Sequence, residues 1–200
     1  MIKTYRKDEV AWFYSGTDPR WDLSNVAGKN RIWWPLEKVP ENLWYSSEAL
    51  YQAAKYTADV LVPEGQDYGG KRLRDVIQAQ TSGLWAKWLQ EWAEEAGLVR
   101  PDWERDGVRV QAMAWVLELK VFWNPERFGK VLRETGDMEI VEISSRDPFW
   151  GCLRKPGGLL VGENHLGRLL TDLRGKMEAV LAGEFTYPDG FLLPGERIAA

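Results

Sequence analysis

Apolar and polar residues alternate along this chain with two different periods. Aromatic and aliphatic residues cluster at 10–14 and 31–34 between Gly, Pro and Asn positions, which predicts two short strands. Residues 138–144 also alternate, without a clean polar face, and we interpret them as a mostly buried strand. Strands of this kind account for only a small part of the sequence.

Helical spacing dominates the remainder. Ser46 or Ser47 is a suitable N-cap for a helix running to about residue 58. Three further helices are predicted at 71–80, at 84–96 and from Pro101 to the break at Asn124-Pro125, followed by a short one ending near 134. Asn164 is predicted to cap the last long helix, whose apolar stripe is Leu166, Leu170, Leu173 and Met177. The predicted fold class is α+β, predominantly helical, in one domain of residues 1–200 whose segment 185–200 is a surface arm.

Composition excludes several classes of protein. The 200 residues carry a net charge of −4, so nucleic acid would have to be bound locally rather than by a global field. No apolar run is long enough to span a bilayer, and the N-terminus lacks a signal-peptide pattern. With one cysteine there is no internal disulfide, and we expect a cytoplasmic protein with no membrane partner.

Metal and cofactor chemistry has little support in the residues. One Cys and one His exclude the usual structural zinc frameworks, and no glycine-rich phosphate loop is present. We therefore expect no metal and no organic cofactor. The 12 Trp residues are unusual, and they can serve either the core or stacking on a base or sugar.

The first candidate site lies on the helix after Ser47. Glu48, Gln52 and Lys55 are spaced i, i+4 and i+7, so they share one helix face. Such a face can line a polar pocket. The alternative is a solvated face with an ordinary helix ion pair.

The second candidate is the segment 144–151, where a strand ends. Pro148 restricts Asp147 to an extended backbone, and Gly151 permits a tight turn that could hold Trp150 against a ligand. The alternative is a loop anchored by a buried Trp.

Two further segments could bind an anion. Residues 157–167 are rich in glycine and lead into a helix N-terminus, where free N–H groups can bind phosphate. Arg100 stands just before another predicted helix start. The alternatives are a glycine-rich turn with an Asn cap and a dipole-matched first turn. His165 is interpreted as a packing or capping residue, and nothing marks Cys152 as a nucleophile.

Taken in order, these segments resemble the YbiA-like (NADAR) family over about residues 10–180. The matching residues are Trp12-Phe13-Tyr14, Ser24-Asn25, the helix 47–56 with its Glu, Gln, Ala and Lys, Arg100 to Trp103, Lys120 to Pro125, Thr135-Gly136-Asp137, Glu142, Ser144, Asp147, Trp150-Gly151, Gly162, Asn164, Leu166-Gly167 and Arg174. Two positions depart from the pattern. Ala49 replaces the family's His, and Ser82-Gly83-Leu84 stands near the expected Gly-Arg.

The resemblance implies a YbiA-like fold with a few short strands and an N-glycosidase activity on phosphorylated ribosides. It implies Glu48 as acid/base, Asp147 as second carboxylate and Lys55 as an amine able to form a Schiff base. The substrate-binding residues it implies are Ser24, Asn25, Gln52, Arg100, Trp150, Gly151 and Asn164, the last through the amides near Gly162 to Asn164.

The substrate remains open between alternatives. The first is a ribosylamino-pyrimidine phosphate of riboflavin biosynthesis. The second is ADP-ribose attached to guanine in nucleic acid, the only case in which nucleic acid would be a partner. The third is a non-catalytic module that binds NAD or ADP-ribose. The oligomeric state is not determined by the sequence.

Overall fold

The computed structural model describes residues 1–14, 16–57, 59–104 and 107–186. The strands are β1 (Lys3–Arg6), β2 (Ala11–Phe13), β3 (Ile32–Trp33), β4 (Leu43–Trp44), β5 (Ile140–Ser144), β6 (Cys152–Lys155) and β7 (Leu159–Gly162). The helices are α1 (Ser47–Ala53), α2 (Leu73–Gln78), α3 (Gly83–Leu89), α4 (Glu91–Glu95), α5 (Val108–Trp123), α6 (Lys130–Glu134) and α7 (His165–Leu181), with short turns η1 (Trp21–Leu23), η2 (Pro40–Asn42), η3 (Pro125–Gly129) and η4 (Pro156–Gly158). The fold is α+β and mainly helical, as predicted.

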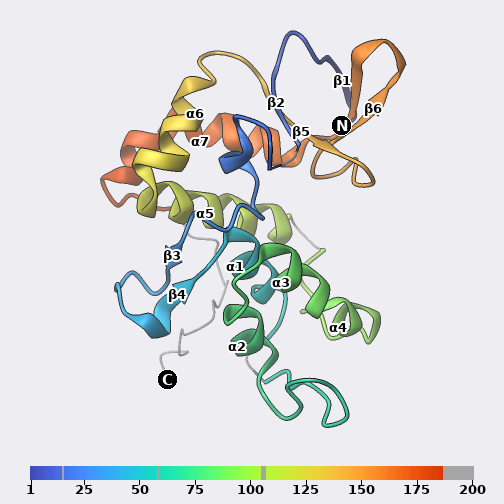
Figure 1. The fold of residues 1–200 in the computed structure, drawn as a ribbon, viewed down its shortest axis with the longest axis vertical. Coiled ribbons are helices and arrows are strands. Elements are labelled where there is room, and N and C mark those ends of the chain that lie inside the picture. Colours follow the sequence, from blue (N-terminus) through green and yellow to red (C-terminus); the bar gives the residue numbers. More distant parts are fainter. Residues whose placement is uncertain (15, 58, 105–106, 187–200) are drawn as a thin grey trace.

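A five-stranded sheet has the order β1-β7-β6-β5-β2 (Figure 1). β5 pairs in parallel with both β2 and β6, while β7 pairs antiparallel with β6 and β1. Strands β2, β3 and β5 confirm the predictions. The sequence pattern predicts neither β6 nor β7, and β7 lies in the segment interpreted as a glycine-rich turn. The two strands form a hairpin whose turn uses the positive φ values of Gly157 and Gly158.

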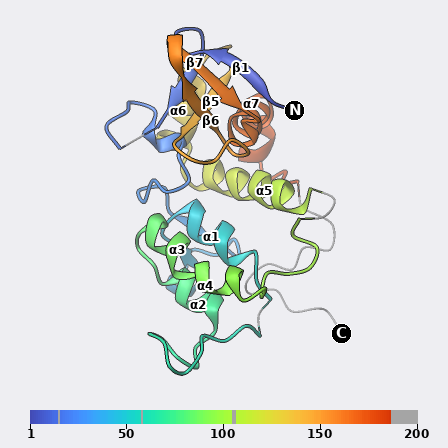
Figure 2. The ribbon, with the colours of Figure 1, turned by 90° about the vertical axis from the view of Figure 1, so that its right-hand side faces the viewer.

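Helix α5 lies between the sheet with α6 and α7 on one side and α1–α4 on the other (Figures 1 and 2). It packs against α7, α1 and β3. Every residue from Trp115 to Val121 is buried, so this helix is enclosed on all sides rather than along one stripe. No helix in the described ranges is both long and apolar enough to cross a membrane.

Three predicted helix boundaries are wrong. The helix expected to run to about residue 58 ends at Ala53, so that Lys55 lies in the turn after α1. The helix expected from Pro101 begins only at Val108, because Gly107 turns the chain with a φ of 72° and precedes the first helical turn. The helix expected at 84–96 is broken at Gln90 into α3 and α4. Gln90 is buried and its side-chain oxygen accepts a hydrogen bond from the Tyr56 hydroxyl, so a tertiary contact holds the break.

Two buried charges on α5 fix distant segments to the centre of the fold. Lys120 is fully buried and donates to the Ser24 carbonyl oxygen at 2.8 Å, while Glu118 binds Lys176 and accepts from the Thr186 amide at 2.7 Å. Buried charges persist where such partners satisfy them. Phe185 packs against Phe122, and of the arm predicted at 185–200 the segment 187–200 lies outside the described residues.

Candidate active site

The polar face of α1 is buried, not solvated. The Ser46 hydroxyl accepts a hydrogen bond from the Ala49 amide at 3.1 Å and so caps the helix. Glu48, Gln52 and Lys55 are 8%, 3% and 9% exposed. Three polar side chains on one buried face need a polar environment, and this excludes the alternative of a solvated surface stripe.

Ser24 and Asn25 lie beside the start of α1. The Ser47 hydroxyl donates to Asn25 Oδ1 at 3.0 Å, and the Glu48 amide donates to the Asn25 carbonyl oxygen at 3.1 Å. From the opposite side, Lys120 Nζ holds the Ser24 carbonyl oxygen. The loop after η1 is therefore fixed between α1 and α5.

Asp147 organises the turn after β5. Its backbone amide donates a hydrogen bond to the Ser144 hydroxyl at 2.9 Å. Its Oδ1 accepts hydrogen bonds from the amides of Phe149 and Trp150, each at 3.0 Å. The turn presents the Trp150 ring edge-on to Tyr51, with centroids 5.7 Å apart.

These three regions enclose one cavity of about 670 Å³. Seven of the ten residues predicted for the site line it, namely Ser24, Asn25, Glu48, Gln52, Lys55, Asp147 and Trp150. Sequence positions more than ninety residues apart thus meet around a volume within the usual range for a small-molecule site. Glu48, Lys55 and Asp147, the three residues predicted to be catalytic, all line this cavity.

Lys55 lies in this cavity in contact with Glu94 of α4. The ammonium group binds the Glu94 carboxylate, and the Lys55 side chain is 11% exposed against 41% for Glu94. Its Nζ also lies 6.0 Å from the centroid of the Tyr51 ring. Burial raises the pKa of Tyr51 well above its ordinary value, with repulsion from Glu48 as the next cause.

Three predicted residues are placed differently. Arg100 is not among the described residues that line the cavity; it forms a two-point contact with Asp102 at 2.6 and 2.7 Å. Gly151 packs so tightly that a Cβ atom there would lie 2.7 Å from the Glu142 carbonyl oxygen. Asn164 has a φ of 52°, and its side chain donates to the Ile140 carbonyl oxygen and accepts from the Glu142 amide.

The prediction that free amides near Gly162 to Asn164 bind phosphate is wrong. The amides of residues 163–166 donate to the carbonyl oxygens of Pro148, Gly151, Phe149 and Trp150, respectively. The start of α7 is thus fastened to the Asp147 turn, and its hydrogen-bonding capacity is used inside the protein. Asn164 stands at the N-cap position, but its side chain makes no capping bond. His165 stacks on Phe149 with centroids 4.1 Å apart, which confirms a packing role.

Six charged residues to which sequence reasoning gave no role line the cavity: Lys87, Glu91, Glu94, Glu104, Arg109 and Glu142. Arg109 lies in the first turn of α5, with its guanidinium carbon 3.7 Å from the Phe149 ring centroid. Glu142 has a usable sequence signal, because the alternation of 140–144 places it on the face opposite Val141 and Ile143.

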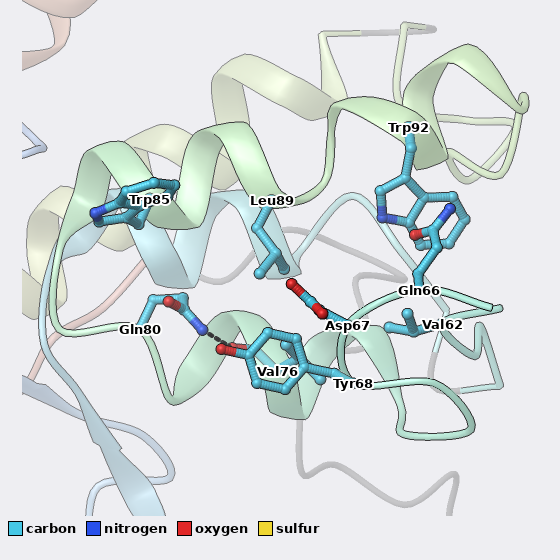
Figure 3. A pocket seen from close by; sticks show the side chains of 9 residues that line it. All are labelled: Val62, Gln66, Asp67, Tyr68, Val76, Gln80, Trp85, Leu89 and Trp92. Carbon is cyan, nitrogen blue, oxygen red and sulfur yellow. Dashed lines mark hydrogen bonds between the residues drawn. The ribbon is translucent and has the colours of Figure 1, made fainter. Parts of the chain in front are cut away.

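A second cavity of about 520 Å³ lies along α2, α3 and α4 (Figure 3). Its described lining residues are Val62, Gln66, Asp67, Tyr68, Val76, Gln80, Trp85, Leu89 and Trp92. None of the predicted site residues is among them. The larger cavity, where the polar face of α1 meets the Asp147 turn, is therefore the candidate active site.

Comparison with known proteins agrees with this arrangement. An N-glycosidase of Nostoc punctiforme is 38% identical over 147 residues, which cover 72% of this chain and 81% of the relative. A riboflavin biosynthesis protein of Vibrio vulnificus is 35% identical over 140 residues, which cover 70% of this chain but 32% of that longer protein. The solved structure of the E. coli protein YbiA superposes with a TM-score of 0.62 at 26% identity, covering 92% of this chain and 94% of YbiA. A family model described as the NADAR domain matches residues 12–178, and the chain belongs to that family.

Proposed function

We propose that this protein is an N-glycosidase that hydrolyses the bond between ribose C1 and nitrogen in a phosphorylated riboside. The observation that carries the proposal is the meeting of Glu48, Lys55 and Asp147 in one cavity of about 670 Å³. The relative named as an N-glycosidase supports the reaction class, and the relative named as a riboflavin biosynthesis protein supports a ribosylamino-pyrimidine phosphate as substrate.

Breaking a C1–N bond leaves an electron-poor sugar centre, and carboxylates beside that centre lower the barrier. We assign Glu48 to the acid/base work at the anomeric carbon, because its carboxylate is held at 2.7 Å by the Gln52 side-chain amide. We assign Asp147 to stabilising the positive charge. Its Oδ1 holds the turn and so fixes the position of the carboxylate.

Lys55 is the proposed nucleophile on the ring-opened aminoriboside. A lysine attacks a carbonyl-type carbon as a neutral amine, and Lys55 lies at the cavity wall with its side chain only 11% exposed. Attack forms a bond between Lys55 Nζ and C1, and the C1–N bond to the base then breaks, so that the protonated base nitrogen leaves as a free amine. Water hydrolyses the imine between Lys55 and C1, which releases ribose 5-phosphate and restores the amine.

Recognition of the substrate is divided between two kinds of residue. Trp150, held edge-on against Tyr51, offers a ring face for the base or ribose. Arg109 and Lys87 are the cavity-lining cations that we assign to the phosphate in place of Arg100.

The test is incubation of the purified chain with ribosylamino-pyrimidine phosphate, with ribose 5-phosphate and free base measured as products. We expect turnover of this substrate and none of an ADP-ribosylated guanine oligonucleotide. Turnover of the oligonucleotide alone would replace the small-molecule assignment. Tight binding of ADP-ribose with no turnover of either substrate would contradict an enzymatic role.

A further inference from the structure

Glu142 is a cavity residue that the mechanism above does not use. The alternation of β5 packs Val141 and Ile143 against Tyr5, Cys152 and Leu160 on one face of the sheet. Glu142 and Ser144 leave the strand on the other face and line the cavity. Among the described residues, no hydrogen bond or ion pair of the Glu142 carboxyl group is found, although its backbone amide is held by Asn164.

Titratable groups from several elements surround the Glu142 side chain. Glu48 on α1 and Asp147 in the next turn are acidic, whereas Lys87 on α3 and Lys120 on α5 are basic. Cys152 on β6 is the neighbouring thiol, and its pKa is raised to about 11 by burial and by Glu142. Desolvation first, and then repulsion from Glu48 and Asp147, raises the pKa of Glu142 to about 8.

The two carboxylates that repel a charge on Glu142 are engaged as acceptors. Glu48 accepts from Gln52, and Asp147 accepts from two backbone amides. Glu142 lies close to both without such donors. Where environments separate neighbouring carboxyl groups in this way, the group that keeps its proton is suited to be the acid.

We propose that Glu142, projecting from β5 into the cavity beside Glu48 and Asp147, is the general acid that protonates the departing nitrogen. This assignment rests on the proposed N-glycosidase function. The Glu142 proton passes to the nitrogen as the C1–N bond breaks, and the bonding electron pair stays with the nitrogen, which leaves as a neutral amine. The oxygen of a water molecule finally bonds to C1, and a proton from that water restores the acid form of Glu142.

The test compares two phosphorylated ribosides that differ in the need for this proton. An aminopyrimidine is a poor leaving group without protonation, whereas 4-nitroaniline leaves with less help from an acid because its anion is stabilised by the nitro group, and the nitrogen of both ribosides can open the ring for attack by Lys55. For Glu142→Gln we expect a loss of about 10²-fold or more in kcat/KM on ribosylamino-pyrimidine phosphate. On the riboside phosphate of 4-nitroaniline we expect a clearly smaller loss.

The pH profile gives a second readout that a merely structural role would not move. In the wild-type protein, kcat/KM for the aminopyrimidine substrate should fall as Glu142 ionises near pH 8, and the residual activity of Glu142→Gln should lack this fall. Glu139→Gln is the matched control, because Glu139 immediately precedes β5 but is exposed and bound to Lys3 at 2.9 Å. It should keep wild-type rates and the wild-type profile.

The outcomes separate the two proposals. No turnover by the wild-type protein would refute the proposed function itself. Wild-type turnover together with an unchanged rate and pH profile in Glu142→Gln would refute only the role of Glu142. If thermal unfolding shows that Glu142→Gln does not fold, the pH profile of the wild-type protein tests the assignment instead. Wild-type kcat/KM on the aminopyrimidine substrate that does not fall above about pH 8 would overturn the role of Glu142.

Discussion

Two helix starts were predicted to carry the site, and the fold uses them in opposite ways. Glu48 on α1 and Lys55 in the turn after that helix line the larger cavity. The start of α7 around Asn164 donates its amides to the Asp147 turn. Both segments are polar and both include the start of a helix. The difference lies in what their polar groups bind. The polar side chains of the first segment face a cavity, whereas the backbone amides of the second form hydrogen bonds to another segment of the chain.

This contrast separates acting residues from positioning residues. The charged side chains of Glu48 and Lys55 lie at the cavity wall, so their removal should change the reaction rate. Groups at the start of α7 hold the turn that carries Asp147 and Trp150, so their removal should first change the stability of the fold. Each of the following variants tests one side of this division.

The largest effect is expected for Lys55→Ala. Loss of the amine removes the proposed nucleophile, and we expect kcat to fall by about 10³-fold, which corresponds to about 4 kcal/mol in the barrier. Borohydride reduction during turnover should add the mass of the sugar phosphate to the wild-type peptide containing Lys55. Lys130→Ala is the control, because Lys130 is an exposed helical lysine near Glu134. Full activity of Lys55→Ala would show that Lys55 takes no part in the reaction.

The second-largest effect is a loss of stability, expected for Asn164→Ala. The substitution removes hydrogen bonds to Ile140 and Glu142 and leaves a non-glycine residue at a φ of 52°. We expect the free energy of unfolding to fall by about 2–3 kcal/mol, because two buried backbone groups lose their partners. Urea denaturation measures this loss.

Asn164→Asp provides the matched comparison for that position. It retains the acceptor for the Glu142 amide but loses the donor to the Ile140 carbonyl oxygen, so its stability should lie between those of the wild type and Asn164→Ala. A large rise in KM with unchanged stability would instead make Asn164 a ligand-binding residue.

The sequence predicts the helical α+β class and the face of α1 because both rest on local spacing. It fails where long-range contacts decide the geometry. Gln90 breaks a continuous helical pattern because it binds Tyr56, and nothing near residue 90 encodes that contact. Arg100 is predicted as a phosphate ligand because it precedes an expected helix start, but the helix begins seven residues later than expected. The role of Arg109 depends on a ring forty residues away.

A smaller effect on substrate affinity should distinguish these two arginines. Arg109→Ala should raise KM for the phosphorylated riboside by about 10-fold or more, because a charge-assisted hydrogen bond is lost. Arg100→Ala should leave KM within about twofold, since Arg100 is bound to Asp102 outside the cavity. Repeating both measurements on the riboside without its phosphate should abolish the difference. Equal effects on both substrates would show that Arg109 does not contact phosphate.

The most gradual effect is a change of stability with pH. Glu142 keeps its proton in the folded state up to about pH 8, whereas in the unfolded chain it ionises near its ordinary value of 4.5. The folded state therefore binds more protons between these values, and the free energy of unfolding should fall as pH rises, by at most about 1.4 kcal/mol per pH unit.

Lys120 acts with the opposite sign at higher pH. Burial lowers its pKa to about 7 from 10.5, so above pH 7 the unfolded chain binds the extra proton and stability rises with pH. The two contributions oppose each other between about pH 7 and 8. Denaturation curves from pH 5 to 10 should fall, level off and then rise. In Glu142→Gln the initial fall should vanish while the later rise remains, because Lys120 still loses its proton; an unchanged fall would assign the low-pH slope to other groups.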